Sequence, residues 1–520
     1  MTGLALDAEI LIIGSGPAGV SVALPLVQAG RRVLMIDGDA AEALPGVEGP
    51  QPDPSWRRTL GKELEALQPE DGLSPKLRTP AARMIVDAFH QMTGIATDNF
   101  AVVGARARGG LSRIWGGYVG EFDDDDLTGW PLRFADLQPS YHTVTERIGI
   151  SGSDNDDMAA FHGLSGPVMP APPIGPAAAS ILENYRRGDP QPGFALGLAR
   201  NALLAADRAD RKACDLSLSC LWGCARGAIY DARQDLAALR RYPNFELVDG
   251  ACAVRLEQDG EVWRTVTQSS RAFRTSRIAL AAGALGTLRL VAPLLPVGLQ
   301  RIPLLSSPVM VMPLLLPHLL GATAPLVGYA LAQLGYTMRL SPAPGDYVTG
   351  GVYEVTALPS SSFVARLPLG RRAGTVLFDA LAPALAVATS YFPGRFSSNT
   401  AAWRVIDGAA QITIHGGFAG DFAASAARTQ KRLRKIWRRL GGWALPGGSI
   451  ALPGTDVHFG GLFPMGSDCA NGSSRYGELN AAQGLFVVDG SSLPTVSSKF
   501  ITLTIMANAD RIGRYMSAQS

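Results

Sequence analysis

The sequence predicts an α/β fold in two parts: a Rossmann-like domain and a second, α+β domain built on a mostly antiparallel sheet. Three observations carry this prediction. Residues 9–37 (EILIIGSGPAGVSVALPLVQAGRRVLMID) read as a strand, a glycine-rich turn, a helix and a second strand. Residues 485–494 (LFVVDGSSLP) read as a further strand that ends at Asp489 and Gly490. Between residues 300 and 450 the pattern changes to alternating strands mixed with helices, which we assign to the second domain.

The glycine-rich turn has the pattern that holds a dinucleotide. Ile10 to Ile13 form a continuous apolar run, which suits a parallel strand buried on both faces. Gly14 permits the tight turn, Gly16 lacks the Cβ that would keep the backbone away from a pyrophosphate, and Gly19 lets the helix approach the strand. The helix then presents its free N–H groups to the phosphates. Asp37 ends the second strand, where a carboxylate accepts hydrogen bonds from an adenosine ribose. Together with its distant complement, this turn predicts bound FAD.

Composition indicates a large enzyme without a nucleic-acid partner. The chain has 520 residues, 47% of them hydrophobic, and a formal net charge of +2. It can therefore bury a sizeable core in two domains, and no basic patch suggests nucleic acid. The first residues, MTGLALDAEI, lack a basic segment followed by a signal-type apolar run. A cytoplasmic location is the resulting expectation.

No metal site is predicted. Cys214, Cys220 and Cys224 lie close together, but their spacing matches no usual zinc pair. The acidic run from Asp123 to Asp126 is interpreted as a solvated turn, because adjacent carboxylates do not converge on one ion without a shaped loop.

The pattern of predicted strands and helices divides the chain into two domains. We assign residues 1–300 and 451–520 to a discontinuous FAD-binding domain with insertions that contribute to the substrate domain, and residues 301–450 to the substrate-binding domain. Residues 245–256 read as a strand pair, and residues 277–283 as a buried strand that returns to the nucleotide-binding sheet before a helix. The glycine-rich segment 104–117 is expected to run beside a bulky group such as a flavin ring.

Residues 302–338 contain no Asp, Glu, Lys or Arg, which on charge alone suggests a membrane span. Five prolines in this segment contradict such a span because they would repeatedly break the helix. The favoured interpretation is buried core or the wall of an apolar pocket. Contact with a membrane surface or a lipid-linked substrate is the alternative considered.

Six segments, taken in order, resemble the glucose–methanol–choline (GMC) family of flavin oxidoreductases. They are GSGPAG (14–19), GGLSRIWGG (109–117), CLWGCARGA (220–228), ALAAGALGTLRLV (279–291), HFGGLFPMG (458–466) and FVVDGSSLPTVSSKFITLTIMANADRIGRYM (486–516). The resemblance covers most of the length but little of the substrate domain. It implies an FAD-dependent enzyme that oxidises a C–OH group.

The resemblance also implies roles for individual residues. The cofactor-binding set it implies is Gly14, Gly16, Gly19 and Asp37 for the ADP half, Gly110 and Ser112 for the flavin or its phosphates, the backbone of Ala253 or Val254 for the adenine, Ala282 in the AAGAL turn, and Asp489 and Gly490 for the ribityl and pyrophosphate region. Ile114 stands where some relatives have a histidine bonded to the flavin, so FAD is expected to be noncovalent. A helix beginning near Thr502 would aim its positive end at the flavin pyrimidine edge.

The expected catalytic base is His458, which lies in a glycine-rich turn and falls on the catalytic position of the family. Oxidation of an alcohol requires removal of a hydroxyl proton as hydride leaves for flavin N5, and histidine suits that role near neutral pH. His415, in the TIHGG turn, is a second candidate. The other four histidines are interpreted as structural or surface residues.

One position departs from the family. Phe500 stands where relatives place an asparagine or histidine that pairs with the first histidine, and Ile501 stands where proline is common. Phenylalanine forms no conventional hydrogen bond. Lys499 or His415 could take over the role, the substrate could be more apolar and use the ring as a wall, or the redox reaction could have been lost. A one-residue slip in the alignment would also put Lys499 at the oxygen site.

The function expected is therefore oxidation of a C–OH group in a small, partly apolar molecule, with His458 as base and FAD as hydride acceptor. The alternatives are an isomerase or cyclase that uses bound flavin without net redox turnover, and a catalytically silent FAD-binding protein. The sequence leaves open both the substrate and the electron acceptor, oxygen or quinone.

Overall fold

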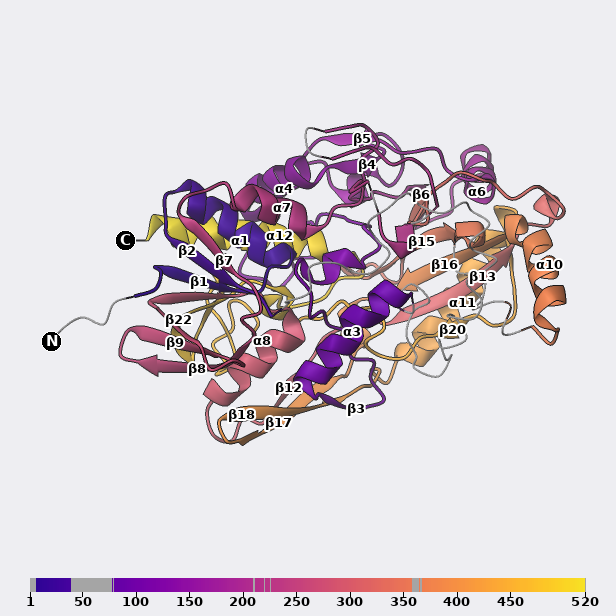
Figure 1. Cartoon of the computed structure of the whole chain (residues 1–520). Coiled ribbons are helices and arrows are strands. Elements are labelled where there is room, and N and C mark those ends of the chain that lie inside the picture. The colour runs from indigo at the N-terminus through magenta and orange to yellow at the C-terminus, as the bar shows by residue number, and fades with distance from the viewer. Residues whose placement is uncertain are drawn as a thin grey trace.

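The computed structural model describes residues 6–38, 77, 79–208, 211–218, 220–224, 226–357, 364 and 367–519 (Figure 1). Two large sheets organise these residues. One is mostly parallel and contains the strands nearest to both chain ends, and the other is antiparallel. The predicted fold class, a Rossmann-like part joined to an α+β part on an antiparallel sheet, is confirmed.

The first sheet has the strand order β21-β22-β11-β1-β2-β7. Its strands are β1 (Ile10–Ile13), β2 (Val33–Ile36), β7 (Phe245–Val248), β11 (Arg277–Leu280), β21 (Glu478–Leu479) and β22 (Ala482–Val487). All neighbours pair in parallel except β21 with β22. β1 and β2 read ILII and VLMI, and every residue of both is buried, as a strand covered on both faces requires.

Helices from both ends of the chain lie together beside this sheet. Figure 1 shows α1 (Pro17–Gln28) and α12 (Thr502–Ala518) side by side, with α4 (Phe134–Ile148) and α7 (Ala232–Leu239) next to them. The Arg31 guanidinium donates to the carbonyl of Ser517 at 2.8 Å. A Cβ on Gly513 of α12 would lie 2.6 Å from the Val22 carbonyl of α1, so the two backbones meet closely there. The N-terminal and C-terminal segments therefore form one packed layer.

The second sheet is antiparallel, in the order β19-β13-β16-β15-β14-β6, with β20 also pairing with β13. Its strands are β6 (Phe194–Leu198), β13 (Val309–Leu315), β14 (Leu334–Arg339), β15 (Tyr347–Glu354), β16 (Leu385–Tyr391), β19 (Trp443–Ala444) and β20 (Ser449–Ile450). One face packs on α6 (Pro176–Arg187) and α11 (Phe422–Arg439) in a single apolar core. The opposite face turns toward the first domain, because Thr349 on β15 bonds to Ser498 just before α12.

A third sheet lies across the predicted domain boundary. It contains β12 (Arg301–Pro303), β17 (Thr400–Ile406), β18 (Ala409–His415) and β3 (Ala96–Asp98). Ile302, Trp403 and Ile414 share an apolar core with Leu11 and Leu280 of the first sheet. The 301–450 stretch therefore supplies strands to both halves of the molecule, and the packing does not follow the predicted division at residues 300 and 450.

The strand pair predicted for residues 245–256 is not a hairpin. β7 pairs with β2 in the first sheet, whereas β8 (Ala253–Asp259) pairs with β9 (Val262–Thr267), which pairs with β10 (Ala272–Thr275). The strand and helix predicted after residue 277 are confirmed as β11 and α8 (Ala284–Val291).

The remaining elements are short or peripheral. They are α3 (Pro80–Thr93), β4 (Ile150–Gly152), α5 (Ala159–His162), β5 (Val168–Pro170), α10 (Arg371–Leu381) and the 3-10 helices η4 (Gly110–Arg113), η5 (Cys220–Trp222), η6 (Ala292–Leu294), η7 (Pro317–Leu319), η8 (Val355–Ala357), η9 (Ala382–Ala384), η10 (Gly394–Phe396) and η11 (Gly490–Ser492). The charge-free segment 302–338 forms β12, β13, η7 and β14. None of the helices in the described ranges has the length and apolar character needed to cross a bilayer.

Candidate active site

One cavity is lined by residues from five of the six segments that resemble the GMC family, the exception being residues 220–228. It occupies about 1420 Å³, including space open to solvent. Among its lining residues are Gly14, Gly16, Asp37, Gly110, Ser112, Ala253, Ala282, Asp489 and Gly490. Two predicted cofactor residues do not line it. Val254 is replaced on the wall by its neighbour Ala253, and Gly19 lies behind the turn, where a Cβ would overlap the Gly14 carbonyl.

Glycine is found at positions 14 and 16 of the turn for different structural reasons. Gly14 has a φ of +104°, and a Cβ there would overlap the Ala281 carbonyl of the neighbouring strand segment. Gly16, in contrast, has an ordinary φ of −70°, and a Cβ on it would come no nearer than 3.8 Å to Gly110. The protein alone therefore does not require glycine at position 16. Its missing side chain keeps the cavity open at the N-terminus of α1, as close approach of a phosphate requires.

Asp37 also braces the turn. Both the backbone N–H (3.0 Å) and the hydroxyl (2.5 Å) of Ser15 donate to Asp37 Oδ2. The N–H of Gly109 in turn donates to the Ser15 hydroxyl at 3.0 Å. Asp37 thus connects the first turn to the glycine-rich loop that was expected beside a flavin ring.

Ser112 and Asp489, which also line the cavity, form hydrogen bonds within the protein. The Ser112 hydroxyl donates to the Gly109 carbonyl at 2.6 Å and accepts from the Ala232 N–H at 3.0 Å. Asp489 accepts from the Ser491 N–H (3.0 Å) at Oδ1 and from the Thr287 hydroxyl (2.5 Å) at Oδ2. Burial raises the pKa of Asp489. These polar groups fix the wall, and Gly110 and Gly490 leave space next to them.

The start of α12 reaches this cavity, with Ile501, Thr502 and Ile505 in its wall. The helix begins at Thr502, as the sequence predicts. Like any helix, α12 has free N–H groups in its first turn, and its 17 residues give it a dipole whose positive end lies at the cavity.

His458 lies in an aromatic cluster next to this cavity. Its neighbours Val457 and Phe459 line the cavity. Its ring centroid is 5.6 Å from that of Phe500 and 5.3 Å from that of Tyr391, and the Tyr391 and Phe500 centroids are 5.0 Å apart. The structure therefore brings together the two positions, 458 and 500, that the sequence singled out.

Asp456 positions the backbone of this turn. Its carboxylate accepts from the N–H groups of Ser307 at 2.8 Å and His458 at 3.2 Å. Burial raises the pKa of Asp456 to about 7, although these hydrogen bonds oppose the shift. Sequence reasoning missed Asp456, whose only sequence signal is its place two residues before the histidine.

His415 does not join this cluster. It ends β18 in the third sheet, 40% of its side chain is exposed, and its Nδ1 lies 3.3 Å from Asp98. Its proposed role as the second polar group at the substrate oxygen is therefore not supported by its position.

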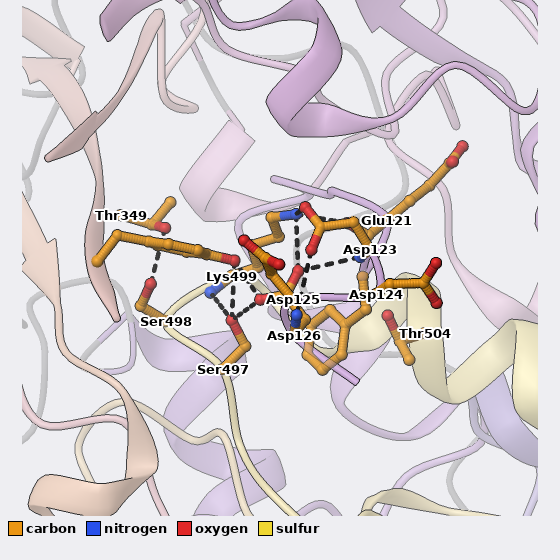
Figure 2. Close-up of polar contacts among 12 residues, drawn as sticks. Glu121, Asp123, Asp124, Asp125, Asp126, Thr349, Ser497, Ser498, Lys499 and Thr504 are labelled. Carbon is orange, nitrogen blue, oxygen red and sulfur yellow. Dashed lines mark hydrogen bonds and ion pairs between the residues drawn. The ribbon is translucent and has the colours of Figure 1, made fainter. Parts of the chain in front are cut away.

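Lys499 also points elsewhere, and the interpretation of the acidic run as a solvated turn is wrong for Asp126, which is buried, whereas Asp123 is half exposed. Figure 2 shows Lys499 among the carboxylates of that run. Its Nζ lies 2.7 Å from Asp126 Oδ2 and 2.8 Å from Asp123 Oδ2, and it donates to the Glu121 carbonyl at 3.0 Å. Only 2% of the lysine side chain is exposed. The ammonium is buried against carboxylates, so it cannot act at an oxygen site beside His458.

Burial and attraction compete in this ion cluster. Burial would lower the pKa of Lys499, but the two carboxylates outweigh it and raise the pKa above its ordinary value. Burial also opposes ionisation of Asp123, yet the adjacent ammonium and its hydrogen bonds lower the pKa of that carboxyl. At Asp126, which is fully buried, burial outweighs the attraction of the lysine and raises the pKa of the carboxyl.

The cluster ties the two domains together just before α12. The Ser497 hydroxyl donates to Asp126 Oδ1 at 2.6 Å, and the Tyr347 hydroxyl of β15 donates to the same carboxylate. The hydroxyls of Thr349 and Ser498 are 2.9 Å apart, as Figure 2 also shows. The segment that carries Phe500 is therefore anchored to the second sheet.

The cysteine cluster lies behind the glycine-rich loop. Cys214, Cys220 and Cys224 are reduced and pack beside Trp115, a cavity-lining residue. Burial raises the pKa of Cys220 to about 12. Within the part of the chain that the structure describes, no three His, Cys, Asp or Glu side chains are grouped to hold a metal ion.

The joining of a glycine-turn α/β domain to an antiparallel-sheet domain is also found in a solved oxidase structure, and this shared fold supports the resemblance found in the sequence. The structure superimposes on pyridoxine 4-oxidase from Mesorbium loti with a TM-score of 0.64. The match covers 99% of this chain and 100% of that one at 17% sequence identity, which shows a shared fold.

Two characterised proteins are similar in sequence. Paromamine 6'-oxidase of Streptomyces fradiae is 28% identical over 265 residues, which is 48% of this chain and 41% of that protein. 6'''-Hydroxyparomomycin C oxidase of Streptomyces lividus is 28% identical over 266 residues, 49% of this chain and 43% of that protein. The matches thus span less than half the length of these relatives. A scan of protein-family models finds no match.

Proposed function

We propose that this chain is an FAD-dependent oxidoreductase of the GMC type that oxidises a C–OH group of a small, partly apolar molecule. The main support is the continuity of one cavity from the Gly14–Gly16 turn to the turn that carries His458. The similar proteins support a small hydroxylated substrate, since they are named as oxidases of paromamine, 6'''-hydroxyparomomycin C and pyridoxine.

The residues on the cavity wall fit FAD. Gly16 leaves open the space that a Cβ would fill at the N-terminus of α1, which suits a pyrophosphate. Asp37 ends β2 on the cavity wall, where it would hold the adenosine ribose. Gly110 and the start of α12 would hold the flavin, with the helix dipole favouring negative charge on the ring. Bound FAD would supply the hydride acceptor at N5.

FAD would be held without a covalent bond. Ile114 follows η4 and packs with Val103 and Val457 in a small apolar cluster. An isoleucine side chain has no atom that could bond to the flavin.

In the proposed reaction His458 accepts the hydroxyl proton of the substrate. The imidazole is half-buried, beside the rings of Tyr391 and Phe500, and its backbone is fixed by Asp456. Phe500 stacks on Tyr118 at 4.2 Å between centroids and provides an apolar wall. This arrangement would exclude water and orient a partly apolar substrate next to the base.

The test is anaerobic reduction of the purified yellow protein by a panel of alcohols. The parent should bleach, and His458→Ala should keep its FAD while the rate of bleaching falls by about 10²–10⁴-fold. His415→Ala is the matched control, because that histidine lies in the third sheet beside Asp98, and it should bleach like the parent. Parental bleaching in His458→Ala would overturn the base assignment.

Other outcomes separate the alternatives. Product formation with the flavin still oxidised after a single anaerobic turnover would indicate an isomerase or cyclase. No turnover of any compound, combined with stable binding to a protein partner, would indicate a silent FAD-binding protein. Oxygen uptake and quinone reduction, measured in parallel, identify the electron acceptor.

A further inference from the structure

Position 500 lacks the hydrogen-bonding group that the proposed reaction needs. As hydride leaves the carbon and a proton leaves the oxygen, negative charge develops on that oxygen, and a donor aimed at it speeds the reaction. Phe500 offers no such donor. The two polar candidates from the sequence are also excluded, because Lys499 is buried among carboxylates and His415 lies in the third sheet beside Asp98.

Tyr391 lies where a substitute donor would have to be. It is the last residue of β16, and in the sheet register it stands beside Thr349, whose side chain bonds to Ser498 two residues before Phe500. Tyr391 therefore projects from the face of the second sheet that turns toward the first domain. Its ring centroid is 5.3 Å from that of His458 and 5.0 Å from that of Phe500.

The hydroxyl of Tyr391 differs from those of nearby tyrosines. The hydroxyls of Tyr118, Tyr336 and Tyr347 bond to His162, Ser390 and Asp126, respectively. Within the described part of the chain, the Tyr391 hydroxyl has no hydrogen-bond partner, and its side chain keeps some accessible surface. A phenol that is left without a protein partner beside a candidate base is available to a ligand.

We propose that Tyr391 is a catalytic residue whose hydroxyl donates a hydrogen bond to the substrate oxygen, opposite His458, and so fills the role that Phe500 cannot. This inference rests on the proposed function. With FAD bound, the C–H bond would break with its electron pair passing as hydride to the flavin, and the O–H bond would break with its proton passing to His458. The carbonyl forms as Tyr391 stabilises the oxygen. Tyr391 keeps its own proton, because burial raises the pKa of the phenol well above 10.

The first test is Tyr391→Phe, followed by anaerobic stopped-flow reduction with an alcohol that bleaches the parent. The variant loses one oxygen atom that has no described protein partner, so its FAD content should be unchanged and its melting temperature should stay within about 2 °C. The rate constant of flavin reduction should fall by about 10²–10³-fold. Calorimetric binding of the same alcohol to the FAD-free proteins gives a second readout, and the variant should bind it more weakly.

A substitution at position 500 makes the test sharper. In the double variant Tyr391→Phe with Phe500→Asn, the amide at position 500 supplies a hydrogen-bond donor. Its rate of flavin reduction should be about tenfold or more above that of Tyr391→Phe alone. The control is Tyr336→Phe, which removes a tyrosine hydroxyl from the opposite face of the same sheet. Its reduction rate should stay close to the parental one.

The outcomes distinguish this inference from the proposed function. If the parent does not bleach with any alcohol, both are overturned. If the parent bleaches and Tyr391→Phe bleaches at the same rate, only the role of Tyr391 is overturned. If Tyr391→Phe loses FAD or melts much earlier, the hydroxyl has a structural role and the inference is also wrong.

Discussion

The Lys499 ammonium lies 2.7 Å from Asp126 Oδ2, with 2% of the lysine side chain and none of the aspartate side chain exposed. A buried charge pair of this kind is costly to form, and removing one partner leaves an uncompensated charge. Lys499 also stands next to Phe500 in the chain. The ion pair therefore holds the chain segment that carries Phe500.

Replacing Lys499 by Met should lower the free energy of unfolding by about 3–5 kcal/mol, because Asp126 is left buried without its partner. Urea unfolding of the FAD-free protein measures this. Lys431→Met, on the exposed face of α11, is the control and should change stability little. Adding Asp126→Asn to Lys499→Met should recover part of the loss. Equal unfolding midpoints for the parent and Lys499→Met would contradict this role.

Asp456 should give the protein a stability component that depends on pH. Its folded-state pKa of about 7 lies above the ordinary value of 3.8, because burial disfavours the charged form. Such a group stabilises the fold fully below about pH 4, and this contribution is lost as pH rises to about 7. The melting temperature of Asp456→Asn should therefore fall less than that of the parent between pH 4 and pH 7.5.

Melting curves across this pH range measure that difference. Asp189→Asn, at an exposed position, serves as the control and should follow the parental curve. Parallel curves for the parent and Asp456→Asn would show that the buried carboxyl does not titrate in this way.

Gly14 and Gly16 should respond differently to replacement by alanine. Gly14→Ala places a Cβ against the Ala281 carbonyl at a φ of +104°, so it should destabilise the FAD-free protein by about 1–3 kcal/mol. Gly16→Ala meets only an ordinary contact with Gly110, so its FAD-free protein should be as stable as the parent. It should nevertheless bind FAD at least about tenfold more weakly. Fluorescence titration with FAD, alongside urea unfolding, separates the two effects.

FAD should leave the denatured protein. Because Ile114 offers no bonding atom, acid precipitation should release all yellow colour into the supernatant, and the protein band on a denaturing gel should show no flavin fluorescence. Colour that stays with the precipitated chain would reveal a covalent attachment elsewhere.

The sequence predicts those parts of the structure whose cause is local. The apolar run at Ile10–Ile13, the Gly14 turn and the helix after it specify one βαβ unit, and all three are present. The neighbourhood of His458 and Phe500 came from the family resemblance. Both are confirmed as neighbours by the geometry, whereas their catalytic roles stay predictions.

Other features depend on contacts that no local pattern contains. Lys499 and Asp123 are 376 positions apart, and nothing near either residue indicates the pairing. The alternation in β16 predicts that Tyr391 and Thr389 share a face, but the face that meets His458 is set by the pairing of β16 with β13 and β15. The third sheet crosses the predicted boundary for the same reason, since β3 and β18 pair across more than 300 residues.

The close packing of α1 on α12 has a consequence for biosynthesis. The first nucleotide-binding turn leaves the ribosome early, but its helix cannot complete its contacts until Gly513 and Ser517 have been made. Through most of translation the nascent chain would hold an unfinished cofactor cleft with apolar surface uncovered, a state that favours aggregation. Shortening the protein within α12 should therefore reduce the soluble yield even where every residue of the glycine turn is intact.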